Sequence, residues 1–335
     1  MIKANKKIAA DYYHVLGTLY FNQGNFEQAI QKLERSVEMR VESGYEKDSS
    51  LALTYNNIGT TYLYLGDNSR ALSFYERALN IALESNAARE DAEIAMYYMN
   101  IGIVYARGGD FDKASEYFKK NLEINRKILN PLDLDLALIY NNLGRLNYLL
   151  SRRDEAIQYH NLAENLIIRK FGAEYYALGE IYVNKGNIYS DMNDFDKALD
   201  YFKKSLQIYK SGDKNHSQRI APVYNNIGSV YFDEENFEKS IEYFELSYGL
   251  TNDPISQTLL LRNLARSYLN LDEVDKAEQL ILRSIEVAKN KLSKNHYEIG
   301  NSYLYYGEFL LSNNRFDEAL DYFHSAKYIM LHNFS

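Results

Sequence analysis

The chain has 335 residues, of which 46% are hydrophobic and 25% charged; this is the composition of a folded protein, but more length than one compact core usually holds. Its net charge of −8 argues against a nucleic-acid partner, which requires a basic face. There is no cysteine, so disulfides, thiolate metal sites and cysteine nucleophiles are excluded.

Neither a targeting segment nor a membrane span is predicted. Residues 1–17 carry lysines with no apolar run behind them, so they do not resemble a signal peptide. No stretch approaches 18 uninterrupted apolar residues. We therefore expect a cytoplasmic protein without a membrane partner.

A pattern of about 42 residues recurs along the chain. Its reference positions, here called anchors, are Gly17, Gly59, Gly102, Gly144, Gly186, Gly228, Ala265 and Gly307. The steps between them are 42, 43, 42, 42, 42, 37 and 42 residues. A large side chain follows most anchors by three residues, a small one follows each by twelve, and a bulky one follows by sixteen.

Each unit of the pattern is predicted to form two helices joined by a short turn. Apolar residues recur at spacings of three and four, which is the period of a helix and not of a strand. Turns such as QGNF at 23–26 and GGDF at 108–111 hold Asn or Asp, which are good N-caps for the second helix. The small residue at +12 lets the two helices approach closely, and Pro222 fits a first helical turn.

These spacings resemble the tetratricopeptide repeat. The motif Y-x-x-[LI]-G-x-x-Y occurs at Tyr13–Tyr20 and Tyr55–Tyr62, with tyrosine at the family's tryptophan position, and A-x3-F follows at Ala114–Phe118 and Ala198–Phe202. The period is similar to that of kinesin light chain repeats. It is also similar to that of the arrays found with bacterial CHAT-type, caspase-like peptidase domains.

The resemblance implies an all-α fold: a right-handed α-solenoid of eight antiparallel helix pairs, forming a single array over residues 1–335. The expected repeats cover residues 10–44, 52–86, 95–129, 137–171, 179–213, 221–250, 258–291 and 300–333.

Asparagine stands two residues before six consecutive anchors. This asparagine ladder comprises Asn57, Asn100, Asn142, Asn184, Asn226 and Asn263. Asparagine costs about a few tenths of a kcal/mol in a helix relative to good helix formers, so its recurrence indicates another role. The position before it holds asparagine only now and then, as at Asn56, Asn141 and Asn225.

Two interpretations of the ladder stay open. In the first, the resemblance places it on a concave groove lined by the first helices, where an amide can bind both C=O and N–H groups of an extended peptide. In the second, each asparagine hydrogen-bonds a neighbouring helix and sets the spacing of the repeats. Both can hold together.

Side chains one turn beyond the ladder are expected to set specificity. Arg107 and Arg145 lie in successive repeats and are predicted to meet in the groove, with Arg262 and Arg266 farther along and Tyr64 as a further contact. Arginine binds carboxylates through two parallel hydrogen bonds, so the set favours acidic side chains or a terminal carboxylate.

No catalytic or metal-binding arrangement is evident. The six histidines form no H-x3-H or H-E-x-x-H pair, and no serine lies in a G-x-S-x-G context. The carboxylates of FDKA, FEKS and FDEA recur at the start of second helices, where they suit the helix dipole. We expect no enzymatic activity, no cofactor and no metal.

The main hypothesis is therefore a non-enzymatic scaffold that holds a peptide or partner segment in its groove. One alternative is a regulatory receptor resembling Rap-type bacterial peptide sensors. Another is the sensing part of a CHAT-type protease system whose catalytic domain lies elsewhere. An apolar cluster at the C-terminal end is expected to fold back on the last pair or to contact a partner; it consists of Tyr328, Ile329, Met330, Leu331 and Phe334.

Overall fold

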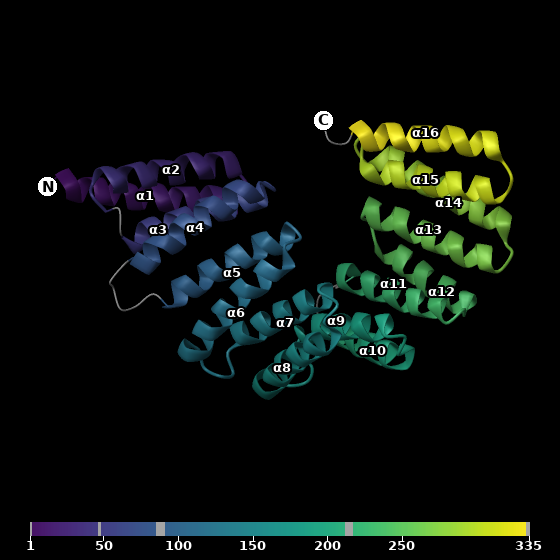
Figure 1. The fold of residues 1–335 in the computed structure, drawn as a ribbon, viewed down its shortest axis with the longest axis horizontal. Coiled ribbons are helices and arrows are strands. Elements are labelled where there is room, and N and C mark those ends of the chain that lie inside the picture. The colour runs from purple at the N-terminus through teal and green to yellow at the C-terminus, as the bar shows by residue number, and fades with distance from the viewer. Residues whose placement is uncertain (1, 46–47, 85–90, 212–216, 333–335) are drawn as a thin grey trace. The chain divides into compact units, whose positions relative to one another are not determined.

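Every regular element of the computed structural model is an α-helix within the residues that it describes, which are 2–45, 48–84, 91–211 and 217–332. The chain divides into two compact units, Met1–Gly172 and Ala173–Ser335. Figure 1 shows antiparallel helix pairs that follow one another in chain order within each unit. The expected all-α solenoid fold is confirmed.

The first unit contains four helix pairs. They are α1 (Ile2–Asn22) with α2 (Phe26–Glu42), α3 (Ser49–Tyr64) with α4 (Asn68–Glu84), α5 (Asp91–Arg107) with α6 (Phe111–Ile128), and α7 (Leu134–Leu149) with α8 (Arg153–Phe171). Each second helix packs on the first helix of the next pair, as α2 does on α3. Successive first helices, such as α3 and α5, also touch.

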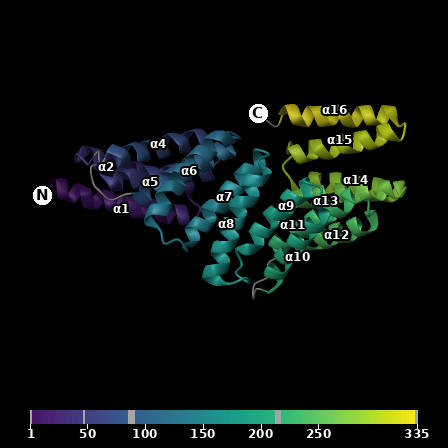
Figure 2. The same ribbon diagram turned by 60° about the horizontal axis from the view of Figure 1, so that its bottom comes forward.

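The second unit repeats this arrangement, and Figure 2 shows its helices from a second direction. Its pairs are α9 (Leu178–Asp191) with α10 (Phe195–Ser211), α11 (Ser217–Asp233) with α12 (Phe237–Leu250), α13 (Pro254–Asn270) with α14 (Val274–Lys291), and α15 (Tyr297–Ser312) with α16 (Phe316–His332). The shortened repeat is the pair α11–α12, whose second helix ends at Leu250 and leaves three residues before α13.

Glycine is required at most anchors because a bulky side chain lies directly against it. A Cβ on Gly102 would lie 2.5 Å from the ring of Phe118, and one on Gly186 would lie 2.5 Å from the ring of Phe202. Only the absence of a side chain lets the ring pack on the helix backbone. The anchor Ala265 is consistent with this account, because the residue sixteen positions later is Ile281 and not an aromatic residue.

The turns between paired helices hold the caps that the sequence predicts. Asn25, Asp110 and Asn236 accept hydrogen bonds from the backbone N–H three residues ahead, at the starts of α2, α6 and α12. These bonds satisfy N–H groups that have no partner within the helix.

Two boundary predictions differ from the structure. The prediction for Pro222 is wrong: α11 begins at Ser217, so Pro222 lies inside the helix and removes one of its backbone hydrogen bonds. The first helices also begin before the expected repeats, α1 at Ile2 and α3 at Ser49. Hydrophobic spacing marks the packed part of a helix, whereas its polar first turn has no such signal.

The C-terminal apolar residues divide between two surfaces of α16. Ile329 is buried in a cluster with Ala288 and Ile299, as the folding-back alternative expects. Tyr328 and Leu331 are exposed, Met330 is half-buried, and Phe334 lies outside the described residues.

Candidate binding surface along the first helices

The ladder asparagines join successive first helices. All six are half-buried, and Asn184 occupies the equivalent position on α9. The other five donate their side-chain amide N–H to the first helix of the preceding pair. The bonds run from Asn57 to His14 Nε2 (3.4 Å), from Asn100 to Asn56 Oδ1 (2.7 Å), from Asn142 to Met99 Sδ (3.9 Å), from Asn226 to Asn187 Oδ1 (2.9 Å) and from Asn263 to Asn225 Oδ1 (3.1 Å). The ladder therefore has a structural role.

Four of the acceptors share one position that sequence reasoning did not assign. His14, Asn56, Met99 and Asn225 each stand three residues before an anchor. The signal for them was the occasional doubled asparagine: its first member accepts from the ladder residue of the next pair, as Asn56 does from Asn100.

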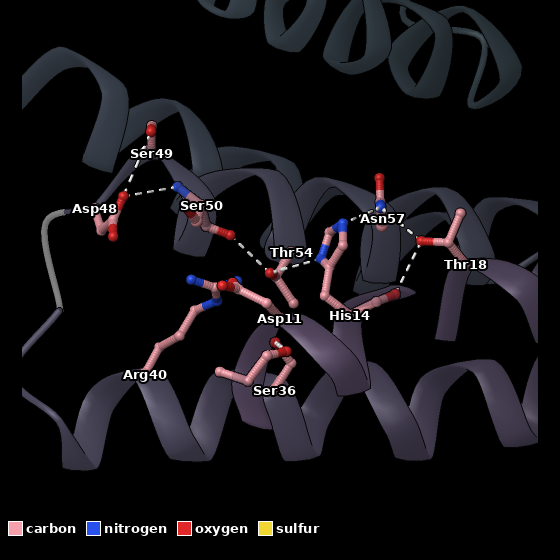
Figure 3. A network of polar contacts seen from close by, with 11 residues as sticks. Asp11, His14, Thr18, Ser36, Arg40, Asp48, Ser49, Ser50, Thr54 and Asn57 are labelled. Atoms are coloured by element: carbon pink, nitrogen blue, oxygen red, sulfur yellow. Dashed lines mark hydrogen bonds and ion pairs between the residues drawn. The ribbon is translucent and has the colours of Figure 1, made fainter. Parts of the chain in front are cut away.

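Between α1 and α3 these hydrogen bonds form a chain in which the donor and acceptor of each bond are fixed by the next, as Figure 3 shows. The Thr54 hydroxyl donates to Ser50 O at 2.7 Å, so its oxygen accepts the Nδ1–H of His14 at 3.0 Å. His14 Nε2 is then the acceptor for the amide of Asn57, which also reaches Thr18 Oγ1 at 3.4 Å. This arrangement requires a neutral imidazole.

The surroundings of His14 favour that neutral form. Burial lowers the pKa of His14, and the positive charge of Arg40 lowers it further; Asp11 acts in the opposite direction. Arg40 is buried and forms an ion pair with Asp11 at 2.6 Å, so both charges lie on α1 and α2. The residues that α3 presents to the imidazole, Thr54 and Asn57, carry no charge.

Three depressions recur at the same register between successive first helices. They lie between α1 and α3, between α5 and α7, and between α11 and α13, with volumes of about 160, 430 and 50 Å³. The side chain at +16 lines each one, together with the ladder asparagine of the next pair; these are Leu33 with Asn57, Phe118 with Asn142, and Phe244 with Asn263. The ladder thus borders concave sites as well as joining helices.

The α5–α7 depression brings together two of the four arginines predicted to bind a carboxylate. Arg107 and Arg145 both line it, together with Asn142 of α7 and the ring of Phe118. Arg107 is held in place by donating to the backbone carbonyl of Leu63 at 3.0 Å. No acidic side chain is among the lining residues.

The structure gives Arg262 a different role from the predicted one. Its guanidinium donates to Glu298 at 3.0 Å and to Ser302 at 3.2 Å, and its side chain is only 12% exposed. It links α13 to α15.

Arg266 and Tyr64 remain accessible. The guanidinium of Arg266 lies 4.5 Å from the ring centroid of Phe232 and lines the α11–α13 depression together with Asp233. Burial raises the pKa of Asp233, although Arg266 acts to lower it. Tyr64 is 65% exposed at the end of α3 and packs edge-on against Phe21, with ring centroids 5.1 Å apart.

The described residues bring no three His, Cys, Asp or Glu side chains together as a metal site. No helix in the described part of the chain has the length and hydropathy of a transmembrane span.

The helix pairs that carry this surface match a known family of repeats. The model of the tetratricopeptide repeat matches residues 8–84, 93–167, 148–211 and 256–326, and two further models of the same repeat match residues 56–125 and 221–254. The chain belongs to the tetratricopeptide repeat family. Members of this family generally serve as non-catalytic scaffolds for protein interactions, and this tetratricopeptide repeat protein has the fold for that role.

Several solved structures share the fold. Aspartyl phosphate phosphatase F from Bacillus subtilis is 15% identical with a TM-score of 0.61, over 88% of this chain and 73% of that chain. A signal transduction ATPase with numerous domains and a tetratricopeptide repeat sensor, from Pyrococcus horikoshii, is 20% identical with a TM-score of 0.60. That match covers 96% of this tetratricopeptide repeat chain and 52% of the ATPase chain.

A kinesin-light-chain-like repeat protein from Podosopora anserina is 15% identical with a TM-score of 0.54, over 61% of this chain and 97% of that chain. The predicted likeness to kinesin light chain repeats is thereby supported at the level of the fold. No sequence among the curated proteins matches the chain.

Proposed function

We propose that this tetratricopeptide repeat protein is a non-enzymatic scaffold that binds an extended segment of another protein along its first helices. The α5–α7 depression would recognise a carboxylate of that segment, from an acidic side chain or a chain terminus. The observation that carries the proposal is that Arg107 and Arg145 both line one depression of about 430 Å³.

The depression combines two kinds of contact that suit such a ligand. The guanidinium groups supply charged donors for a carboxylate, and Arg107 is already oriented by its bond to Leu63 O. Ile103, Phe118 and Leu149 supply an apolar surface for the carbons beside that carboxylate. Hydrogen bonds that involve a charged group contribute about 1.5–3 kcal/mol each.

The ladder can contact the backbone of the same segment. In Asn100 and Asn142, one amide N–H is used in the joint, while Oδ1 accepts no hydrogen bond from a described residue. That oxygen can accept a peptide N–H, and the second amide hydrogen can donate to a peptide C=O. The joint therefore orients each amide for a ligand, so both interpretations of the ladder can hold together.

The equivalent depression in the second unit would prefer a different ligand. The α11–α13 depression holds Asp233 beside Arg266, so it presents both signs of charge in a volume of about 50 Å³. We expect it to contribute less to carboxylate recognition than the α5–α7 depression.

The test compares the chain with a variant that lacks both arginines. The immobilised chain is used to capture partners from a native cell extract, and the bound segment is identified and synthesised. Arg107→Ala combined with Arg145→Ala should weaken binding of that segment by about 10-fold or more, which corresponds to the loss of one charged hydrogen bond.

The matched control is Arg169→Ala, because Arg169 is exposed on the second helix α8, away from the depression. It should bind as the unchanged chain does, and both proteins should keep their helical circular dichroism. Equal affinity of the double variant and the control would contradict the proposal.

A regulatory receptor is the second candidate, and the hydrogen-bonded joints favour it. A ligand bridging α5 and α7 would act on the bond between Asn142 and Met99, and so on the packing of successive pairs. Hydrogen exchange should then slow on α5 and α7 when the segment binds. The CHAT-linked alternative stays a prediction.

A further inference from the structure

The outer face of α1 is apolar and uncovered. Ile8, Tyr12, Val15 and Leu19 follow one another at spacings of four, three and four, and they are 68%, 61%, 66% and 49% exposed. Residues with this spacing lie on one side of a helix. They are called the α1 face below.

Two of these positions, those of Tyr12 and Leu19, are covered in other first helices. Tyr12 stands at −5 from its anchor and Leu19 at +2. In the six pairs that follow another pair within the same unit, no residue at −5 or +2 is more than 4% exposed. These residues are Thr54, Tyr97, Ile139, Val223, Leu260 and Ser302 at −5, and Thr61, Val104, Leu146, Val230, Ser267 and Phe309 at +2. The α1 face thus resembles the packed surface of other first helices, but no second helix covers it.

In those other pairs, the second helix of the preceding pair covers the residues at −5 and +2. Ser240 of α12 lies 3.0 Å from Ser267 of α13, so position +12 of a second helix meets position +2 of the next first helix. Nearer the other end of such a joint, Arg126 Nε of α6 donates to the hydroxyl of Tyr140 of α7 at 3.2 Å. The two helices therefore run antiparallel in a fixed register.

The helix α16 carries the complementary surface, and it is also uncovered. Phe316 at +9 is 59% exposed and Leu320 at +13 is 53% exposed. In the six second helices that are followed by another pair within the same unit, every residue at +13 is buried or half-buried. Leu320 lacks the neighbour that its equivalents have. Phe316, Leu320, Lys327 and Leu331 are called the α16 face below.

We infer that the α16 face of one copy of this chain binds the α1 face of a second copy. The internal register places Leu320 opposite Leu19. It also places Lys327 against Tyr12, where the lysine stem can cover the ring and its ammonium group can lie over the aromatic face. The contact would reproduce between two copies the joint that the chain makes within itself.

The two faces differ, so the contact is heterologous and needs one face of each kind. Association is then expected to grow with concentration, and a copy that lacks one face can still pair with a copy that lacks the other. This consequence separates the inference from a symmetric dimer, in which one face would pair with itself.

Sedimentation velocity from micromolar to millimolar concentration tests the inference. The unchanged chain should rise from the mass of one copy, 39.0 kDa, to at least twice that value. Leu19→Glu and Leu320→Glu should each hold the protein at the mass of one copy. Because each variant keeps one intact face, an equimolar mixture of the two should form a dimer and nothing larger.

Leu138→Glu is the matched control. Leu138 is 47% exposed on α7 and belongs to neither face, so this variant should associate as the unchanged chain does. Circular dichroism should show that all three variants are folded. An unchanged chain that stays monomeric would mean that another protein or segment covers the α1 face, and this would overturn the inference. Association of Leu320→Glu alone would also overturn it, in favour of pairing between two α1 faces.

Discussion

Asn100 donates its side-chain amide to Oδ1 of Asn56, 2.7 Å away, and so links the third helix pair to the second. Asn56 is 5% exposed and in turn donates to Asn57 Oδ1 at 3.4 Å, so the link continues to His14 in the first pair. Three pairs share one line of hydrogen bonds. Residues that look like isolated poor helix formers in the sequence act together in the fold.

Replacing Asn56 with Ala should destabilise the first unit by about 1–3 kcal/mol, because the amide of Asn100 loses its acceptor in a half-buried place. Urea unfolding measures this change. Asn270→Ala is the control: its amide donates to Arg266 O of its own helix and is exposed, so the change should stay within about 0.5 kcal/mol. Additive effects of Asn56→Ala and Asn100→Ala would show that the bond contributes nothing.

Gly186→Ala should destabilise the second unit by about 1–3 kcal/mol, because the new Cβ would lie 2.5 Å from the ring of Phe202. Adding Phe202→Ile should restore part of the loss, since Ala265 and Ile281 already form this combination. Gly249→Ala, at a site in α12 with open space around it, should stabilise by about 0.5–1 kcal/mol. Equal effects of the two alanines would contradict the packing account.

Stability should fall as the pH drops below about 6.5, the ordinary pKa of histidine. The folded pKa of His14 is lowered by burial and by Arg40, so below that pH the unfolded chain binds a proton that the folded chain does not. The contribution is complete above pH 6.5 and is lost on acidification. His14→Gln should flatten this part of the pH profile of urea unfolding, whereas substitution of the exposed His324 should not.

Arg262→Met should destabilise the second unit by about 3–5 kcal/mol, because Glu298 would be left buried without its cation. Replacing both residues with apolar ones should recover much of that loss. Neither variant should change carboxylate recognition at the α5–α7 depression. If a folded double variant no longer captured the partner, Arg262 would belong to the binding surface.

The helices and their pairing are predictable from the sequence because each depends on residues within one repeat. The anchor Gly102 and the ring of Phe118 are sixteen residues apart, and the cap Asp110 lies next to its helix. Because such relations recur in each repeat, they appear in the sequence as a regular spacing of residue types. Arg107 stands at +5 from its anchor and Arg145 at +1, about one helical turn apart on adjacent first helices, so the sequence already indicates that both can line one depression, as they do.

The partner of each ladder residue was not predictable in the same way. Asn100 and Asn56 are 44 residues apart, and the acceptor position holds His, Asn or Met, so no single residue type marks it. The misplaced role of Arg262 has a similar cause. Its partner Glu298 lies in the next repeat, and a charge that faces a neighbouring helix looks the same in sequence as one that faces a ligand.

The bond between Asn142 and Met99 differs from the amide joints in having a thioether as its acceptor, at 3.9 Å. Sulfur of this kind is a weak acceptor, so the α5–α7 joint gains less from its polar contact than the joint that Asn100 makes. In a stack whose units contact only their neighbours, local opening is favoured where one joint is weakest. Backbone amides on either side of Met99 should therefore exchange with solvent earlier than those around Asn56, at the place where the largest depression of the row lies.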